Sequence, residues 1–218
     1  MQKYQGFIFD LDGVIVDSTA VHTAVWVQYL KRFGIDSTGI LQRMHGRRND
    51  EIVRDLFGDD LSEKEIHAHG AAKEALYRQV MLPQLERYLV PGIRDFLERH
   101  ADVPMAVASN AEPANVEGVL ETAGLRRFFR VVVDGHQVER PKPWPDVYWK
   151  AASLLGADPS HCLVFEDSEA GVRAARGAGA RVVGVATTCS DLAGVDLLIR
   201  DFRDPELEEW LAAEYLPS

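Results

Sequence analysis

Cysteine is scarce in this sequence, which contains only Cys162 and Cys189 among 218 residues. The two are far apart and both lie among apolar residues, so we expect reduced core residues rather than a disulfide or a zinc site. Long hydrophobic runs are also missing, which predicts that no helix crosses a membrane. The first expected strand begins so close to Met1 that a signal peptide does not fit before it. These absences predict a cytoplasmic protein.

Basic residues are outnumbered, because 24 Lys and Arg stand against 34 Asp and Glu and give a formal net charge of −10. Nucleic acids and anionic membranes select for basic surfaces, so we expect neither as a partner. A small phosphorylated molecule stays compatible with this charge, since a local pocket of Lys, Arg and backbone N–H groups can bind an anion. Hydrophobic residues make up 46% of the chain, which is enough for a packed core.

A short apolar run near the start of the chain ends in two aspartates. Residues 7–9 predict a strand that is buried on both faces, as in a parallel sheet. Asp10 and Asp12 follow it, and side chains two residues apart on an extended chain project to the same side. Turn capping would explain one aspartate. Two of them directly behind a buried strand favour chemistry, because ligands bind at the carboxyl ends of strands in open parallel sheets.

Two carboxylates this close together need a counter-charge. At about 4 Å and an effective dielectric constant near 20 they repel each other by roughly 4 kcal/mol, and a bound phosphate adds to that. A divalent ion with hard oxygen ligands, Mg2+ above all, supplies the charge. We therefore expect further acids and at least one positive charge from elsewhere in the chain.

The segment 17–88 has the pattern of amphipathic helices without a strand. Ser18 can cap a first helix, a second is expected over residues 51–57, and a capping box at 62–65 starts a third. We expect this segment to form a small all-helical domain inserted into the chain.

Strands and helices alternate after residue 88. Such alternation implies right-handed crossovers and a parallel sheet covered by helices on both faces, so the predicted fold class is α/β. The expected strands cover residues 103–108, 129–133, 162–165, 181–186 and 196–199, and the expected helices cover 113–123, 145–155, 168–178 and 205–213.

Three later strand ends carry polar residues at the place where an active site would need them. Ser109 and Asn110 follow one strand, so that a hydroxyl and backbone N–H groups could meet a phosphoryl oxygen; capping of the next helix by Asn110 explains this segment equally well. Lys142 lies in a loop with three prolines, whose stiffness would position its ammonium group. Glu166 and Asp167 end a third strand and are the additional acids that the repulsion requires.

These four segments, in this order, resemble the motifs of the haloacid dehalogenase superfamily over nearly the whole chain. The matching residues are Asp10 and Asp12, then Ser109, then Lys142, then Glu166 and Asp167. The helical insert is similar to the cap of the subgroup that contains phosphoglycolate phosphatase and β-phosphoglucomutase. The resemblance implies a Rossmann-like core, formed by residues 1–16 and 89–218, and an inserted helical cap domain, residues 17–88.

The resemblance also implies roles for these residues. Asp10 would attack phosphorus and form an aspartyl-phosphate, while Asp12 would protonate the leaving alkoxide and then deprotonate the attacking water. Ser109 and Lys142 would stabilise the phosphoryl oxygens. The implied Mg2+ ligands are Asp10, the backbone carbonyl of Asp12, Asp167, and Glu166 either directly or through water.

Substrate choice is expected to depend on the helical insert. His22 matches the subgroup's Asp-Ser/Thr-x-x-x-His pattern, although an ordinary polar residue on a helix face would look the same. Arg47 and Arg48 could reach a distal carboxylate or a second phosphate of the substrate. A solvated basic turn explains the two arginines equally well.

Together these features favour a Mg2+-dependent phosphatase that acts on a small phosphorylated metabolite, of the sugar phosphate or phosphoglycolate type, as a monomer or homodimer. The nearest alternative is a β-phosphoglucomutase-like isomerase. That enzyme carries a cap arginine after Gly-x-Ser, whereas here Gly46 is followed by Arg47, Arg48 and Asn49. A signalling receiver domain would share the acidic cluster, but the chain length, the helical insert and Asp12 argue against it.

Overall fold

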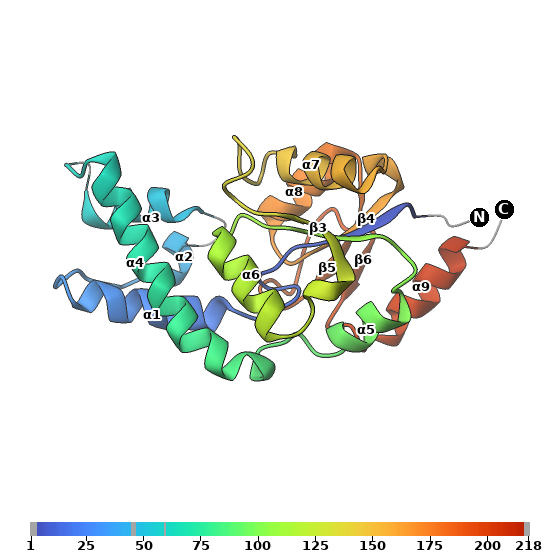
Figure 1. The fold of residues 1–218 in the computed structure, drawn as a ribbon, viewed down its shortest axis with the longest axis horizontal. Coiled ribbons are helices and arrows are strands. Elements are labelled where there is room, and N and C mark those ends of the chain that lie inside the picture. The colour runs from blue at the N-terminus through green and yellow to red at the C-terminus, as the bar shows by residue number, and fades with distance from the viewer. Residues whose placement is uncertain (1–3, 45–46, 59, 216–218) are drawn as a thin grey trace.

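A six-stranded parallel sheet lies at the centre of the computed structural model, which describes residues 4–44, 47–58 and 60–215 (Figure 1). The strand order is β3-β2-β1-β4-β5-β6. The predicted α/β fold, with a parallel sheet flanked by helices, is confirmed. The strands are β1 (Gly6–Phe9), β2 (Met105–Ala108), β3 (Phe129–Val133), β4 (Cys162–Glu166), β5 (Arg181–Val185) and β6 (Leu197–Ile199).

The three central strands β2, β1 and β4 are buried along their whole length, as expected where helices cover both faces of a sheet. Phe9 pairs with Val107 of β2 and with Phe165 of β4, so these strands end nearly level. The residues that follow them therefore emerge at one edge of the sheet. That edge contains the point between β1 and β4 where the strand order reverses, which is where α/β folds bind ligands.

Helices pack on both faces of the sheet. Phe7 and Phe9 join the hydrophobic cluster that includes α5, α6 and α9, whereas Ile8 belongs to the cluster with α7 and α8. This separation follows from the two-residue period of a strand. The helices of this part are α5 (Ile93–Arg99), α6 (Pro113–Thr122), α7 (Asp146–Leu155), α8 (Glu169–Ala178) and α9 (Pro205–Tyr215), with short 3-10 helices η2 (Arg126–Phe128) and η3 (Pro159–His161).

The remaining helices lie together at one end of the molecule (Figure 1). Val16 and Leu89 form an isolated β-bridge where the chain leaves and rejoins the sheet-containing part. Between them, the described residues contain helices and turns but no strand. That this segment is a cap domain of its own remains a prediction. Its helices are α1 (Thr19–Lys31), α2 (Ile40–Met44), α3 (Asn49–Phe57), α4 (Glu63–Met81) and the 3-10 helix η1 (Leu82–Arg87).

The local sequence predicts most helix ends correctly, but it gives the wrong side-chain cap for α1 and does not predict α2 or α5. The capping box predicted at 62–65 does start α4, because the backbone N–H groups and side chains of Ser62 and Glu65 are bonded reciprocally. Ser18 does occupy the N-cap position of α1, but the expected side-chain cap is wrong, since its hydroxyl donates to Asp12 instead. The short helices α2 and α5 were not predicted, because five and seven residues give too few turns for a clear apolar period.

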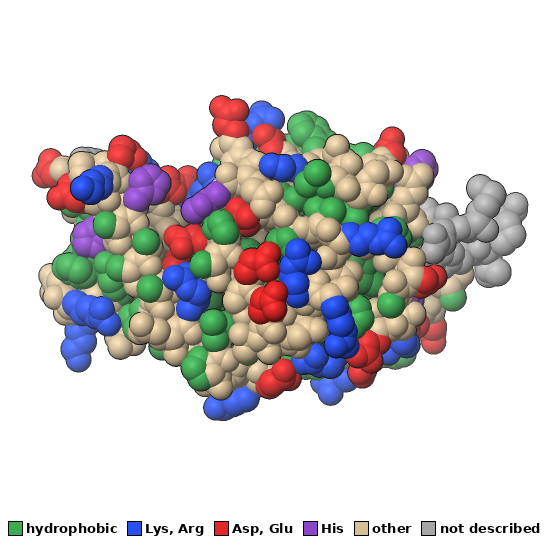
Figure 2. All heavy atoms as spheres, in the orientation of Figure 1, with side chains coloured by type: hydrophobic (Ala, Val, Ile, Leu, Met, Phe, Trp, Pro, Cys, Tyr) green, Lys and Arg blue, Asp and Glu red, His purple; other side chains and the backbone are tan. Residues whose placement is uncertain are grey.

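The surface and the cysteines have ordinary environments. Acidic and basic side chains are interspersed on the face shown in Figure 2. Within the described residues, every helix is too short or too polar to cross a membrane. Cys162 and Cys189 are both free thiols, as predicted; Cys162 is buried and Cys189 is partly exposed.

Candidate active site

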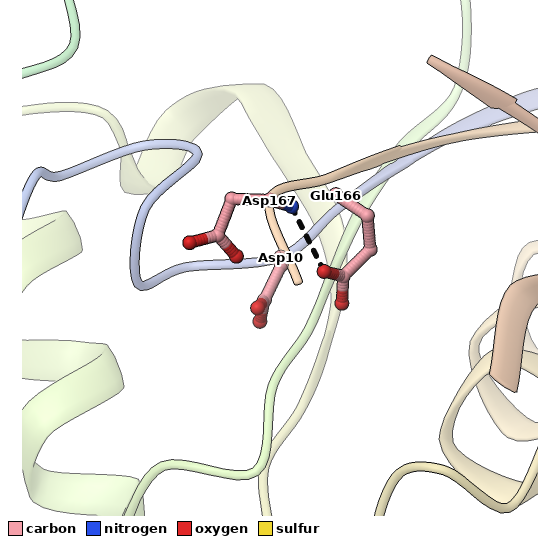
Figure 3. A group of neighbouring side chains, drawn as sticks. All are labelled: Asp10, Glu166 and Asp167. Atoms are coloured by element: carbon pink, nitrogen blue, oxygen red, sulfur yellow. Dashed lines mark hydrogen bonds between the residues drawn. The ribbon is translucent and has the colours of Figure 1, made fainter. Parts of the chain in front are cut away.

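The edge of the sheet brings together residues from the ends of three strands. Asp10 follows β1, Ser109 follows β2, and Glu166 and Asp167 lie at the end of β4. Carboxylate oxygens of Asp10, Glu166 and Asp167 lie within 4.8 Å of one another (Figure 3). Lys142, from the loop before α7, completes the group, with its Nζ atom 2.9 Å from Asp10 Oδ1 and 2.6 Å from Glu166 Oε1.

The three acids and Lys142 are all buried, and this controls their protonation. Burial raises the pKa of Asp10 to about 7, although Lys142 opposes the shift. Burial, with the charges of Glu166 and Asp10, also raises the pKa of Asp167 well above its usual value. When all three carboxylates are ionised, the single ammonium group of Lys142 does not balance their negative charge. The donor set of hard oxygens and this missing charge both fit a divalent cation.

Glu166 differs from the other two acids because its oxygens are already occupied. Its Oε1 accepts from Lys142 Nζ and Tyr148 Oη, and its Oε2 accepts from the backbone N–H groups of Asp167 and Ser168 and from Ser168 Oγ. A carboxylate offers about four lone-pair sites, so five donors leave little capacity for a metal. Glu166 is therefore suited to hold Lys142 and the turn after β4 in place.

Two glycines make room for these acids. A Cβ atom on Gly13 would lie 1.8 Å from Asp167 Oδ2, and one on Gly171 would lie 1.7 Å from Glu166 Oε1. Gly13 also has a φ of +81°, which side-chain-bearing residues rarely adopt. Both positions therefore require glycine if the acid cluster is to keep its shape.

Asp12 lines the same cavity as Asp10 and Asp167 but has other hydrogen-bond partners than the cluster of Asp10, Glu166 and Asp167. Ser18 Oγ donates to Asp12 Oδ1 over 2.5 Å, and His22 Nε2 lies 3.6 Å from the same oxygen. Burial raises the pKa of Asp12, but the hydrogen bonds and charge of His22 and the Ser18 hydroxyl outweigh it and lower the pKa. The two aspartates of the first motif thus occupy different environments.

A hydrogen bond connects the second motif, at Ser109 and Asn110, to the third motif, at Lys142. Asn110 Oδ1 accepts a hydrogen bond from the backbone N–H of Lys142 over 3.2 Å. The explanation of Asn110 as a helix cap is wrong, because Glu112 occupies the N-cap position of α6. Ser109 is buried, and its Oγ accepts from the backbone N–H of Ala111, which leaves the hydroxyl proton free to donate.

A cavity of about 190 Å³ extends from these residues to the helices α1, α3 and α4. Its far end, which we call the cap end, contains a chain of polar contacts. Lys73 Nζ lies 2.7 Å from His22 Nδ1 and 2.7 Å from Glu74 Oε1, and the ring of His22 stacks on Tyr77. Asn115, on α6, donates to Glu74 Oε2 over 2.6 Å. The cap end therefore joins α4 to the sheet-containing part of the molecule.

Arg47 and Arg48 both line the cavity, but their guanidinium groups bind protein atoms. Arg47 lies 3.4 Å from Asp55 Oδ2 and donates to the carbonyl of Glu51. Arg48 donates to the carbonyls of Gly135 and Val138. Contact of either arginine with a substrate remains a prediction.

Lys73, Glu74, Asn115 and Tyr148 were missed by reasoning from the sequence. A signal was available for the first two, because Lys73 and Glu74 fall on the stripe of α4 that includes Ile66 and Tyr77 and is otherwise apolar or small. Charged residues at such positions are buried only when they are paired. Nothing in the sequence around Asn115 or Tyr148 indicates which carboxylate they contact.

Comparison with known proteins identifies the family of this chain. A family model described as haloacid dehalogenase-like hydrolase matches residues 4–179. The fructose-1-phosphate phosphatase of Escherichia coli is 32% identical over 84% of this chain and 97% of its own, and the validoxylamine A 7'-phosphate phosphatase of Streptomyces hygroscopicus is 31% identical over 92% and 95%. A crystal structure of β-phosphoglucomutase from Clostridium difficile superposes with a TM-score of 0.85 at 25% identity, covering 97% of this chain and 98% of that one. The chain therefore belongs to the haloacid dehalogenase-like hydrolase family, as an enzyme of its phosphatase type.

Proposed function

We propose that this protein is a Mg2+-dependent phosphatase that hydrolyses a small phosphorylated metabolite of the sugar phosphate type through an aspartyl-phosphate on Asp10. The observation that carries the proposal is that the two aspartates of the first motif have different partners. Asp10 lies in the acid cluster and contacts Lys142, whereas Asp12 contacts Ser18 and His22. The first environment suits a nucleophile and the second suits an acid–base group.

In the first step, a carboxylate oxygen of Asp10 attacks phosphorus, and the bond from phosphorus to the substrate's alcohol oxygen breaks. Asp12 gives its proton to that oxygen. The negative charge of the bound phosphate favours the protonated form of Asp12 at this stage, against the opposite influence of His22. Lys142 and the Ser109 hydroxyl hold the phosphoryl oxygens while charge is redistributed.

In the second step, water attacks the phosphorus of the aspartyl-phosphate. Asp12, which the first step left deprotonated, accepts a proton of the water, and the negative charge of the phosphoryl group increases its proton affinity against the influence of His22. The bond from phosphorus to Asp10 breaks, inorganic phosphate leaves, and the carboxylate of Asp10 is restored.

Mg2+ would be held by the carboxylates of Asp10 and Asp167 and by the backbone carbonyl of Asp12, with Glu166 acting through water or through Lys142. When bound, the ion neutralises the acid cluster and the phosphoryl oxygens. The shortage of positive charge around Asp10 and Asp167 supports this assignment.

Hydrolysis is favoured over isomerisation by the residue at the start of α3. The mutase arginine that follows Gly-x-Ser has no counterpart at Asn49, whose Nδ2 donates to Glu74 Oε1 over 2.7 Å. A mutase must hold a sugar bisphosphate intermediate and therefore needs a second anion site at the far end of its cavity. Glu74 is an acidic side chain that lines the cavity at that end, so it opposes the binding of a second phosphate there.

The proposal is tested by incubating the protein with Mg2+ and a panel of sugar phosphates and 2-phosphoglycolate, with β-glucose 1-phosphate as the mutase substrate. We expect release of inorganic phosphate from at least one sugar phosphate, and none with Asp10→Asn. Conversion of β-glucose 1-phosphate to its isomer without phosphate release would establish the mutase instead.

A further inference from the structure

Glu74 carries a buried carboxylate and is one of the residues that line the cavity. We propose that Glu74 is a specificity-determining residue, whose carboxylate accepts a hydrogen bond from a substrate hydroxyl and selects uncharged polyhydroxylated monophosphates against bisphosphates and phosphocarboxylates. This inference rests on the proposed phosphatase function and concerns the same cavity.

Three donors from three helices hold Glu74 in place. Oε1 accepts from Lys73 Nζ on α4 and from Asn49 Nδ2 on α3, and Oε2 accepts from Asn115 Nδ2 on α6. Its side chain is only 5% exposed, and the residue lines the cavity. Because a carboxylate offers about four lone-pair sites, one acceptor site remains on Oε2. A hydroxyl group is the substrate group that can donate to it.

The carboxylate of Glu74 is charged under ordinary conditions. Burial opposes its ionisation, but the charges of Lys73 and His22, with the hydrogen bonds from Lys73 and Asn115, outweigh burial and lower its pKa to about 2. Glu112 lines the same end of the cavity, and burial together with the charge of Glu74 raises its pKa. A second phosphate or a carboxylate on the substrate would therefore meet the negative charge of Glu74 beside the Glu112 carboxyl group.

The positive groups nearby are already engaged. Lys73 is paired with Glu74, and Arg78 hydrogen-bonds Asn115 Oδ1 and lies 4.0 Å from Glu112. Arg47 and Arg48 bind Asp55 and backbone carbonyls, as described above. A distal anion that reached Lys73 or Arg78 would lie close to the carboxylates paired with them, whereas a distal hydroxyl could donate to one of these carboxylates.

The test compares two substrates that differ by one phosphate. Initial rates of phosphate release are measured with Mg2+ for fructose 1-phosphate, fructose 1,6-bisphosphate and p-nitrophenyl phosphate, which has no hydroxyl groups. For the wild-type protein we expect kcat/KM for the monophosphate to exceed that for the bisphosphate at least about tenfold. In Glu74→Gln we expect kcat/KM for fructose 1-phosphate to fall about tenfold or more. We expect kcat/KM for p-nitrophenyl phosphate to change less than about twofold. The ratio of kcat/KM for the monophosphate to that for the bisphosphate should become smaller than in the wild-type protein.

Glu63→Gln is the matched control, because Glu63 lies on the same helix with a largely exposed side chain paired to Arg54; it should keep the wild-type preference. Equal losses on all three substrates in Glu74→Gln, or equal wild-type use of the mono- and bisphosphate, would overturn the inference. If Glu74→Gln does not fold, the wild-type ratio alone decides. If the wild-type protein releases phosphate from none of the three substrates, that result would instead count against the proposed function.

Discussion

The two ends of the cavity are both built from buried charges, but their charges are balanced differently. At the core end, the carboxylates of Asp10, Glu166 and Asp167 face the single ammonium group of Lys142. At the cap end, Glu74 is paired with Lys73. The pKa values depend on this pairing: those of Asp10 and Asp167 are raised, whereas those of Glu166, which is bonded to Lys142, and of Glu74, which is bonded to Lys73, are lowered.

This difference indicates what each end needs from outside the protein. Asp10 and Asp167, whose pKa values are raised, are stabilised by an added cation and by chemistry that draws negative charge away from the Asp10 carboxylate. A paired carboxylate with a lowered pKa needs nothing further and can serve as a fixed acceptor. The core end is therefore suited to reaction, and the cap end to recognition.

The largest expected effect comes from Asp10→Asn. The amide keeps the size of the side chain but cannot attack phosphorus, so we expect turnover to fall at least about a thousandfold. Phosphate release from a sugar phosphate measures it, and circular dichroism should show an unchanged fold. Residual turnover near the wild-type rate would mean that Asp10 is not the nucleophile.

Removal of the metal should have a comparable but reversible effect. We expect a chelator to abolish phosphate release and added Mg2+ to restore it. Mg2+ should also raise the melting temperature of the wild-type protein, because a ligand that binds the folded state stabilises it. Asp167→Ala should lose most of this shift, whereas Glu74→Gln should keep it, since Glu74 lies at the cap end. An equal shift in both variants would contradict the division between the two ends.

Lys142→Ala should affect both activity and stability. Its ammonium group is buried between Asp10 and Glu166, so its loss leaves buried acids unpaired. Breaking a buried pair in this way typically costs about 3–5 kcal/mol. We therefore expect a severe loss of turnover and a lower free energy of unfolding, measured by urea titration. An unchanged urea midpoint would contradict this prediction and would indicate that protons or water compensate the unpaired acids at no cost in stability.

Gly171→Ala tests whether Glu166 positions the core end without replacing any of its charges. The added methyl group would occupy the place of the Glu166 carboxylate and displace it. We expect turnover and Mg2+ affinity to fall about tenfold to a hundredfold, as for other groups that orient metal ligands. Gly177→Ala is the control on the same helix, because its methyl group would meet Pro145 only at ordinary contact distances. The two variants should unfold with similar cooperativity but differ in activity.

The core end was largely foreseeable from the sequence and the cap end was not. Asp10, Ser109 and Glu166 each follow or end a short apolar run, and parallel strands of equal height place such residues at one edge. Lys142 was identified by its proline-rich loop. The sheet itself follows from the alternation of strands and helices, and the elements that were not predicted are the two shortest α-helices and the three 3-10 helices.

The cap end depends on contacts between helix faces, which local patterns do not specify. Glu74 contacts Asn49 and Asn115, residues that lie on two other helices far away in the sequence. Two adjacent arginines, Arg47 and Arg48, are easily recognised in the sequence as a candidate anion site. Their guanidinium groups, however, bind protein atoms. The side-chain partner decides the role of a charged residue, and helix packing decides the partner.

The smallest expected effect is a pH dependence of stability that comes from the cap end. The pKa of Glu74 is lowered from 4.5 to about 2 by folding. A lowered pKa contributes stability that is fully present above the unfolded value and is lost as the pH falls from about 4.5 towards 2, by up to about 3 kcal/mol in total. The free energy of unfolding, measured in urea between pH 6 and pH 3, should therefore decline more steeply for the wild-type protein than for Glu74→Gln. Parallel curves would mean that Glu74 is not held as a charged, paired acceptor, and the contrast between the two ends of the cavity would lose its basis.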